Sequence, residues 1–111
     1  MKKFNEHDKA FKNGDWGTKY FLNGPHWEGG LAVFKPGQKL GEHFHREIEE
    51  LFYFLDGKAQ MVVNGKIYQA GAGDVFCVAA GEKHDIINDT AEPVKLLFIK
   101  APYKPDDKIT V

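Results

Sequence analysis

Three histidines and one glutamate stand at spacings that could assemble a metal site. His43 and His45 are two residues apart, and Glu50 follows five residues later. His84 lies in a separate segment further along the chain. Imidazole nitrogens with a carboxylate suit divalent ions such as manganese, iron, nickel, copper and zinc. Because alternate side chains of a strand share one face, His43 and His45 would point the same way.

The neighbouring residues fit an inward-facing cluster of these four side chains. Alternation along residues 50–55 puts Glu50, Phe52 and Phe54 on one face of a strand. Buried polar ligands are costly unless a cation is present, so the arrangement is self-consistent with a metal. The alternative is a set of unrelated surface histidines beside a solvated acidic patch at residues 47–50.

Residues outside the pattern have simpler interpretations. We expect His7 and His26 at the surface, and Glu47 and Glu49 facing solvent. Cys77, the single cysteine, lies in the apolar run 75–78 and is expected to be a small buried hydrophobe.

Composition narrows the class of protein. The chain has 111 residues, 42% of them apolar and 28% charged, which is typical of one globular domain over residues 1–111. The formal charge is -1 and no basic stripe exists, so a nucleic-acid partner is not expected. No apolar run suits a secretory signal or a membrane span. We therefore expect a cytoplasmic protein with no membrane partner.

Short apolar stretches separated by turn residues predict an all-β domain. The expected strands are residues 18–22, 30–35, 42–45, 50–55, 59–63, 66–69, 74–78, 84–88 and 94–100. Asn64-Gly65 predicts a tight hairpin turn. Helical spacing is confined to Phe4, His7 and Phe11, and the two prolines after residue 101 favour an extended arm.

Two stretches resemble the signature motifs of the cupin superfamily. The first, at residues 37–57, reads Gly37-x5-His43-x-His45-x4-Glu50-x6-Gly57. The second, at residues 73–88, reads Gly73-x5-Ala79-x-Gly81-x2-His84-x3-Asn88. Nine of the ten anchor positions match, and the departure is Ala79, where the family has proline.

The resemblance implies a double-stranded β-helix, a jelly-roll-like cupin barrel. It also implies that His43, His45, Glu50 and His84 bind a divalent metal ion, with up to two positions open to water, oxygen or a chelating substrate. Asn88 is expected to brace its strand by hydrogen bonding rather than to bind the metal. The change at Ala79 concerns the rigidity of a turn and leaves the ligand set intact.

The function expected from this resemblance is that of a metal-dependent enzyme acting on a small organic molecule, of dioxygenase, isomerase or lyase type. The alternative is a non-catalytic protein that binds or senses a small ligand. Beyond scattered lysines we find no basic cluster for a sugar phosphate. Residues 96–99 are apolar on both faces of a strand, so we expect a homodimer, with the N-terminal segment and residues 102–111 at its interface.

Overall fold

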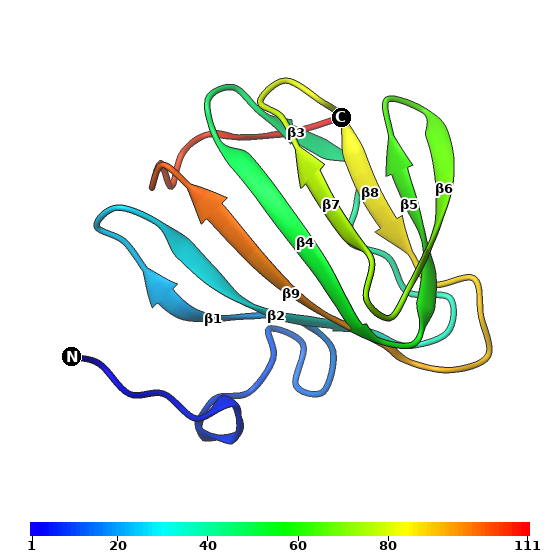
Figure 1. Cartoon of the computed structure of the whole chain (residues 1–111), viewed down its shortest axis with the longest axis horizontal. Helices are drawn as coiled ribbons and strands as arrows, with labels where there is room; N and C mark the ends of the chain where they lie inside the picture. Colours follow the sequence, from blue (N-terminus) through cyan, green and yellow to red (C-terminus); the bar gives the residue numbers. More distant parts are fainter.

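The computed structural model describes residues 1–111 as two antiparallel five-stranded sheets (Figure 1). One sheet has the strand order β1-β2-β9-β4-β7, and the other has the order β10-β3-β8-β5-β6. The elements are η1 (Glu6–Asp8), β1 (Gly17–Asn23), β2 (Glu28–Phe34), β3 (His43–His45), β4 (Glu49–Asp56), β5 (Lys58–Val63), β6 (Lys66–Gly71), β7 (Val75–Val78), β8 (His84–Ile87), β9 (Val94–Ala101) and β10 (Lys108–Thr110). The expected all-β class is confirmed, and the only helical element is the single 3-10 turn η1. No helix has the length and apolarity that a membrane span requires.

Strand β4 shows how side-chain alternation creates the inward face. Glu50, Phe52 and Phe54 are 7%, 2% and 0% exposed, whereas Tyr53 and Leu55 are each 42% exposed. This alternation is the one predicted from the sequence, and it places the single inward carboxylate of the strand at one end of an aromatic row. The site and the core are therefore built on the same strand face.

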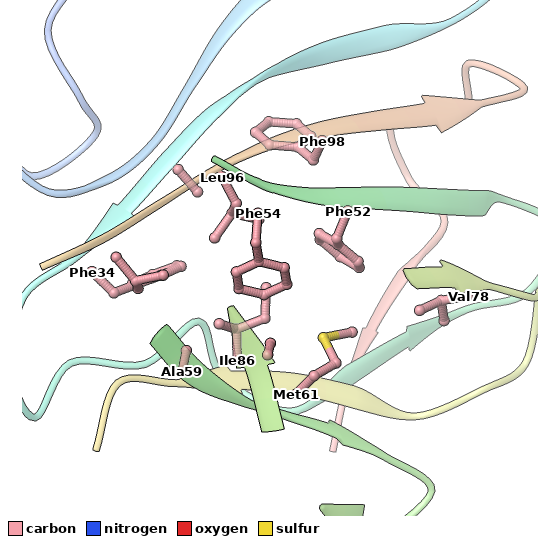
Figure 2. Close-up of a cluster of buried hydrophobic side chains, with 12 residues drawn as sticks. Phe34, Phe52, Phe54, Ala59, Met61, Val78, Ile86, Leu96 and Phe98 are labelled. Atoms are coloured by element: carbon pink, nitrogen blue, oxygen red, sulfur yellow. The ribbon is translucent and has the colours of Figure 1, made fainter. Parts of the chain in front are cut away.

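The hydrophobic core fills the space between the two sheets. In Figure 2, Phe52, Phe54 and Phe98 point from one sheet into the space above Met61 and Ile86 of the other. Phe54, Met61 and Ile86 are completely buried. Burying a side chain of this size contributes about 1.5–3 kcal/mol. These contacts fix the separation of the sheets that carry the candidate site.

Two tight turns depend on residues that tolerate a positive φ, and the first of them was predicted from the sequence. Asn64 and Gly65 have φ values of 50° and 79°, as a two-residue hairpin between β5 and β6 requires. Gly57, at the end of β4, has a φ of 82°, and a Cβ there would lie 2.3 Å from the carbonyl oxygen of Pro93. Only glycine fits this close approach between the β4–β5 turn and the start of β9.

The C-terminal segment, expected to be an extended arm, ends in a strand of the barrel. It turns back and pairs as β10 with β3, with Lys108 opposite His45 and Thr110 opposite His43. Figure 1 shows this red segment crossing the end of the barrel beside β3. The three-residue strand was too short, and too polar, for apolar alternation to reveal it.

Asp107 anchors this return of the chain. Its carboxylate accepts hydrogen bonds from the backbone N–H groups of Arg46, Glu47 and Ile48, at 3.1, 2.9 and 3.0 Å. These three donors lie in the connection between β3 and β4. The same carboxylate therefore ties β10 to the loop that separates His45 from Glu50.

The outer face of the β9–β4–β7 region is apolar. Ile99 and Val75 are 40% and 52% exposed, and Leu51 is half-buried. The expectation that Cys77 is buried is wrong, because β7 is the edge strand and Cys77 points outward and is exposed. The two-sided apolar character of β9 is real, and the homodimer that it suggested stays a prediction.

Replacing Asp107 by alanine is expected to lower the thermal unfolding midpoint by several degrees, because three N–H groups lose their acceptor. Those N–H groups also lower the pKa of Asp107, so the carboxylate stabilises the fold at neutral pH and this contribution is lost as acid protonates it. The difference in midpoint between wild type and Asp107→Ala should therefore be largest at neutral pH and become smaller in acid. Asp106→Ala is the matched control, since that neighbouring side chain is exposed and makes no hydrogen bond or ion pair. Equal midpoints for the two variants in circular dichroism melts would contradict the anchoring role.

Candidate metal centre

The four predicted side chains come together from three strands. His43 and His45 project from β3, Glu50 from β4 and His84 from β8. His43 and His84 stand directly opposite each other in the β3–β8 pairing. One ligand atom from each of the four residues lies within 4.8 Å of the others, and all four residues are buried. This cluster could hold a metal ion.

The donor atoms at the centre of the cluster have no protein partner. Oε1 of Glu50 lies 3.4 Å from Nε2 of His45 and 3.5 Å from Nε2 of His84, both too long for good hydrogen bonds. Both ring nitrogens of His45, Oε1 of Glu50 and Nε2 of His84 are buried and unbonded. Each buried polar atom left without a partner costs about 1–3 kcal/mol. A divalent cation between them would satisfy the three inward donors, so the residues fit a metal.

Backbone carbonyls orient two of the imidazoles. Nδ1 of His43 lies 2.8 Å from the carbonyl oxygen of Gly41, and Nδ1 of His84 lies 3.0 Å from that of Glu82. A carbonyl oxygen can only accept, so in both rings Nδ1 carries the hydrogen. The lone pair is then on Nε2, the nitrogen available to a metal. Outer contacts of this kind commonly fix the tautomer of metal-binding histidines.

Burial and mutual contacts set the charges of the cluster. Burial lowers the pKa of His43 to about 4, and His84 adds to this effect. Burial acts to raise the pKa of Glu50, but contacts with His45 and His84 outweigh it and lower that pKa to about 2. Burial acts to lower the pKa of His84, whereas Glu50 raises it above its ordinary value. At neutral pH the cluster therefore offers a carboxylate and a neutral His43, the states that bind metals.

A family model for the cupin domain matches residues 30–100, a range that contains all four side chains. The chain belongs to the cupin family. The motif resemblance is thereby confirmed at the level of the family.

Individual relatives show the breadth of this cupin family. The chain is 26% identical over 76 residues to the polyketide synthase CurC of Streptomyces cyaneus, which covers 68% of this chain and 49% of CurC. It is 34% identical over 64 residues to an oxalate-binding protein of Thermotoga maritima, which covers 58% of this chain and 53% of that protein. The chain thus spans about half the length of these two relatives.

A solved structure confirms the double-stranded β-helix. A Klebsiella pneumoniae protein with a double-stranded β-helix domain superposes with a TM-score of 0.86 at 20% identity, over 100% of this chain and 97% of that one. At this identity the likeness establishes the fold alone.

The departure from the cupin motif at Ala79 is compensated by a hydrogen bond that proline could not make. The backbone N–H of Ala79 donates to a carboxylate oxygen of Glu82 at 2.8 Å, and the N–H of Glu82 donates back to the carbonyl of Ala79 at 3.2 Å. The carbonyl of Glu82 in turn accepts from His84. The turn before β8 therefore remains fixed, and it orients a ligand candidate.

Asn88, the last position of the second motif, braces the structure as predicted. Its side chain is fully buried, and its Nδ2 donates to the carbonyls of Phe34 and Glu92 at 2.8 and 2.7 Å. Its Oδ1 accepts from the N–H and the hydroxyl of Thr90 at 2.9 and 2.8 Å. Both polar atoms of the Asn88 amide are thus occupied by Phe34, Glu92 and Thr90 and make no contact with the His/Glu cluster.

A cavity of about 300 Å³ opens beside the cluster and is lined by His43, His45 and Glu50. Its walls carry five aromatic side chains, those of Trp16, Tyr20, Phe34, Phe52 and Phe98. The volume lies at the lower end of small-molecule sites. The donor set therefore faces a space that a small ligand can enter, unlike a sealed structural metal site.

Lysines were the functional candidates that sequence reasoning missed. Four of them, Lys12, Lys39, Lys100 and Lys108, line the cavity although they are far apart in the sequence. Lys100 stands opposite Glu50 on β4 and Glu28 on β2, and its Nζ lies 3.1 Å from Glu28 and 3.3 Å from the Tyr20 hydroxyl. Inward alternation of β9 could have pointed to Lys100, but no local pattern relates the other lysines to the site.

Asn88→Ala is expected to destabilise the fold by about 2–4 kcal/mol, because the buried carbonyl of Phe34 and the part-buried carbonyl of Glu92 lose their donor. Denaturant unfolding measures the loss, and Thr90→Ala should cost less because the amide's contacts to both carbonyls remain. Metal content per folded chain should be unchanged in Asn88→Ala. A variant of normal stability that fails to retain metal would mean that Asn88 belongs to the metal site.

Metal affinity is expected to fall in acid, by about tenfold per pH unit below the pKa of His84 in the metal-free protein. His84 is the competing group because its pKa is raised, whereas the pKa of His43, about 4, keeps that ring neutral from pH 8 to pH 5. Competition with a chromophoric chelator at pH 8, 7, 6 and 5 measures this, using Zn²⁺ and correcting for the chelator's own protonation. An affinity independent of pH would contradict metal binding through these imidazoles.

Proposed function

We propose that this cupin is a metal-dependent enzyme that acts on a small organic molecule, with His43, His45, Glu50 and His84 as the metal ligands. The observation that carries the proposal is the set of buried, unpartnered donor atoms facing an aromatic-walled cavity of about 300 Å³. A bound divalent ion would supply a Lewis acid that polarises a substrate oxygen.

The chain's own residues would hold the substrate and supply protons. Phe34, Phe52 and Phe98 form an apolar wall that packs against the substrate and displaces water. Burial raises the pKa of Tyr20, so its phenol stays protonated and can donate to a developing negative charge. Burial acts to lower the pKa of Lys100, but Tyr20, Glu50 and Glu28 raise it, so its ammonium also stays protonated.

The reaction type is proposed as oxygenation, isomerisation or elimination. Redox chemistry requires iron, copper or manganese, whereas isomerisation or elimination needs a Lewis acid and proton-transfer groups such as Tyr20. A non-catalytic binding protein is the second candidate, because the name of the Thermotoga maritima relative assigns it oxalate binding rather than turnover.

The metal ligands are tested by elemental analysis of purified protein. Wild type is expected to retain about one divalent ion per chain, and His43→Ala and Glu50→Ala are each expected to lose about tenfold or more in metal affinity. His26→Ala is the matched control, since that histidine is exposed and outside the cluster. Equal metal content in all four proteins would remove the basis of the proposal.

Turnover separates the enzyme from the binding protein. Protein loaded with Fe²⁺ or Mn²⁺ is incubated with a panel of diketones, thiols and catechols while oxygen uptake and proton NMR of each compound are recorded. Oxygen consumption would favour a dioxygenase, and product formation without it an isomerase or lyase. Compounds that bind only when metal is present, yet remain unchanged, would favour the binding protein.

A further inference from the structure

The cavity beside the cluster is strongly biased toward positive charge. Lys12, Lys39, Lys100 and Lys108 line it, and Glu50 is its only acidic lining residue. The four lysines come from the loop before β1, the segment between β2 and β3, strand β9 and strand β10. The fold thus gathers four ammonium groups around one small space.

One of the four is neutralised within the protein, and three are not. Lys100 forms an ion pair with the buried Glu28, and both side chains are shielded from solvent, at 11% and 7% exposure. The side chains of Lys12, Lys39 and Lys108 form no ion pair and no hydrogen bond. Elsewhere on the molecule Lys35, Lys95 and Lys104 are paired with acids. The free ammonium groups at the cavity therefore lack a counter-charge.

Of the three unpaired lysines, Lys108 is the one that strand register places beside a candidate metal ligand. It stands directly opposite His45 in the β10–β3 pair, and directly opposed residues project on the same face with neighbouring Cβ atoms. Its burial lowers its pKa, and the positive charges of Lys12 and Lys100 lower it further. Glu50 acts in the opposite direction but is the weakest of these influences. An anion in the cavity would relieve this repulsion.

A bound divalent cation would increase the excess of positive charge around the cavity. Glu50 offsets part of the charge of such an ion, and Glu28 offsets Lys100, which leaves Lys12, Lys39 and Lys108 uncompensated. Lys12, Lys39 and Lys108 are exposed, so each alone attracts an anion weakly, but several ammonium groups around one cavity act together. A ligand that binds both the metal and these lysines must therefore bring negative charge of its own.

We propose that the cavity takes a small organic acid, with one oxygen group on the metal and a carboxylate bound by Lys108 and Lys12. The proposal rests on the proposed metal centre and names the chemical class of its ligand. The aromatic walls contact the carbon skeleton between the two ends, and Lys39 adds positive charge at the cavity. Beyond scattered lysines the sequence showed no anion site, and the structure supplies one through β10 and the loop before β1.

Calorimetric titration of the zinc-loaded protein with malonate and acetylacetone tests the ligand class. Both compounds carry two oxygen groups in the same 1,3 arrangement and can place one of them on the metal, but only malonate then has a carboxylate left for the lysines. Malonate is expected to bind at least about tenfold more tightly than acetylacetone, and to weaken as sodium chloride is raised. Methyl phosphate serves as the alternative anion, and it is expected to bind more weakly than malonate.

Variants assign the effect to individual lysines. Lys108→Met and Lys12→Met are each expected to weaken malonate about tenfold and to leave acetylacetone unchanged. Lys58→Met is the matched control, because Lys58 is exposed on β5 and does not line the cavity. Removing an ammonium group near a cation should not weaken zinc binding, so both variants should retain wild-type zinc.

Several results would overturn the assignment. These are equal affinities of wild type for malonate and acetylacetone, unchanged malonate binding in both lysine variants, tighter binding of methyl phosphate, or loss of zinc from Lys108→Met. The proposed metal centre is contradicted by a separate result, which is that wild type retains no zinc. In that case malonate binding to the metal-free protein that falls in both lysine variants would still support the anion site.

Discussion

The Glu50 carboxylate, held between two imidazoles inside an apolar barrel, is the constraint around which the structure is organised. Its Oε1 faces Nε2 of His45 and Nε2 of His84 without a hydrogen bond to either. Such a group in a hydrophobic interior opposes folding unless something satisfies it. The surrounding elements hold the ring nitrogens toward the carboxylate rather than away from it. A cation bound between these atoms would offset this unfavourable local arrangement.

Most of the fold and the ligand cluster could be predicted from the sequence because their signals are local. The alternation of β4 placed Glu50 with Phe52 and Phe54, and Asn64-Gly65 located a hairpin. The prediction that Cys77 is buried was wrong because apolar composition cannot distinguish an edge strand from a central one. Strand β10 was not predicted because its pairing with β3 depends on residues that are more than 60 positions apart. Its anchor, Asp107, looks in the sequence like an ordinary turn residue.

The motif positions act through hydrogen bonds that link the two halves of the site. The N–H of Gly81 donates to the carbonyl of His45 at 2.7 Å, which joins the turn before β8 to the end of β3. The Ala79–Glu82 contacts close that turn, and the Glu82 carbonyl orients His84. The loss of the usual proline at Ala79 is tolerated because a backbone donor replaces ring stiffness. What the motif preserves is the position of His84, and more than one local chemistry can achieve it.

The proposed metal site and the proposed anion site draw on different parts of the chain. The candidate metal ligands lie within the two motifs. Lys12 lies in the loop before β1, and Lys108 lies in β10, the edge strand beside β3. Lys108 reaches the cavity because Asp107 holds β10 against β3, so the charge of the cavity depends on the contact between Asp107 and the loop that joins His45 to Glu50. If both proposals hold, the motifs would supply the metal ligands of this barrel, and residues outside them would select its small-molecule ligand.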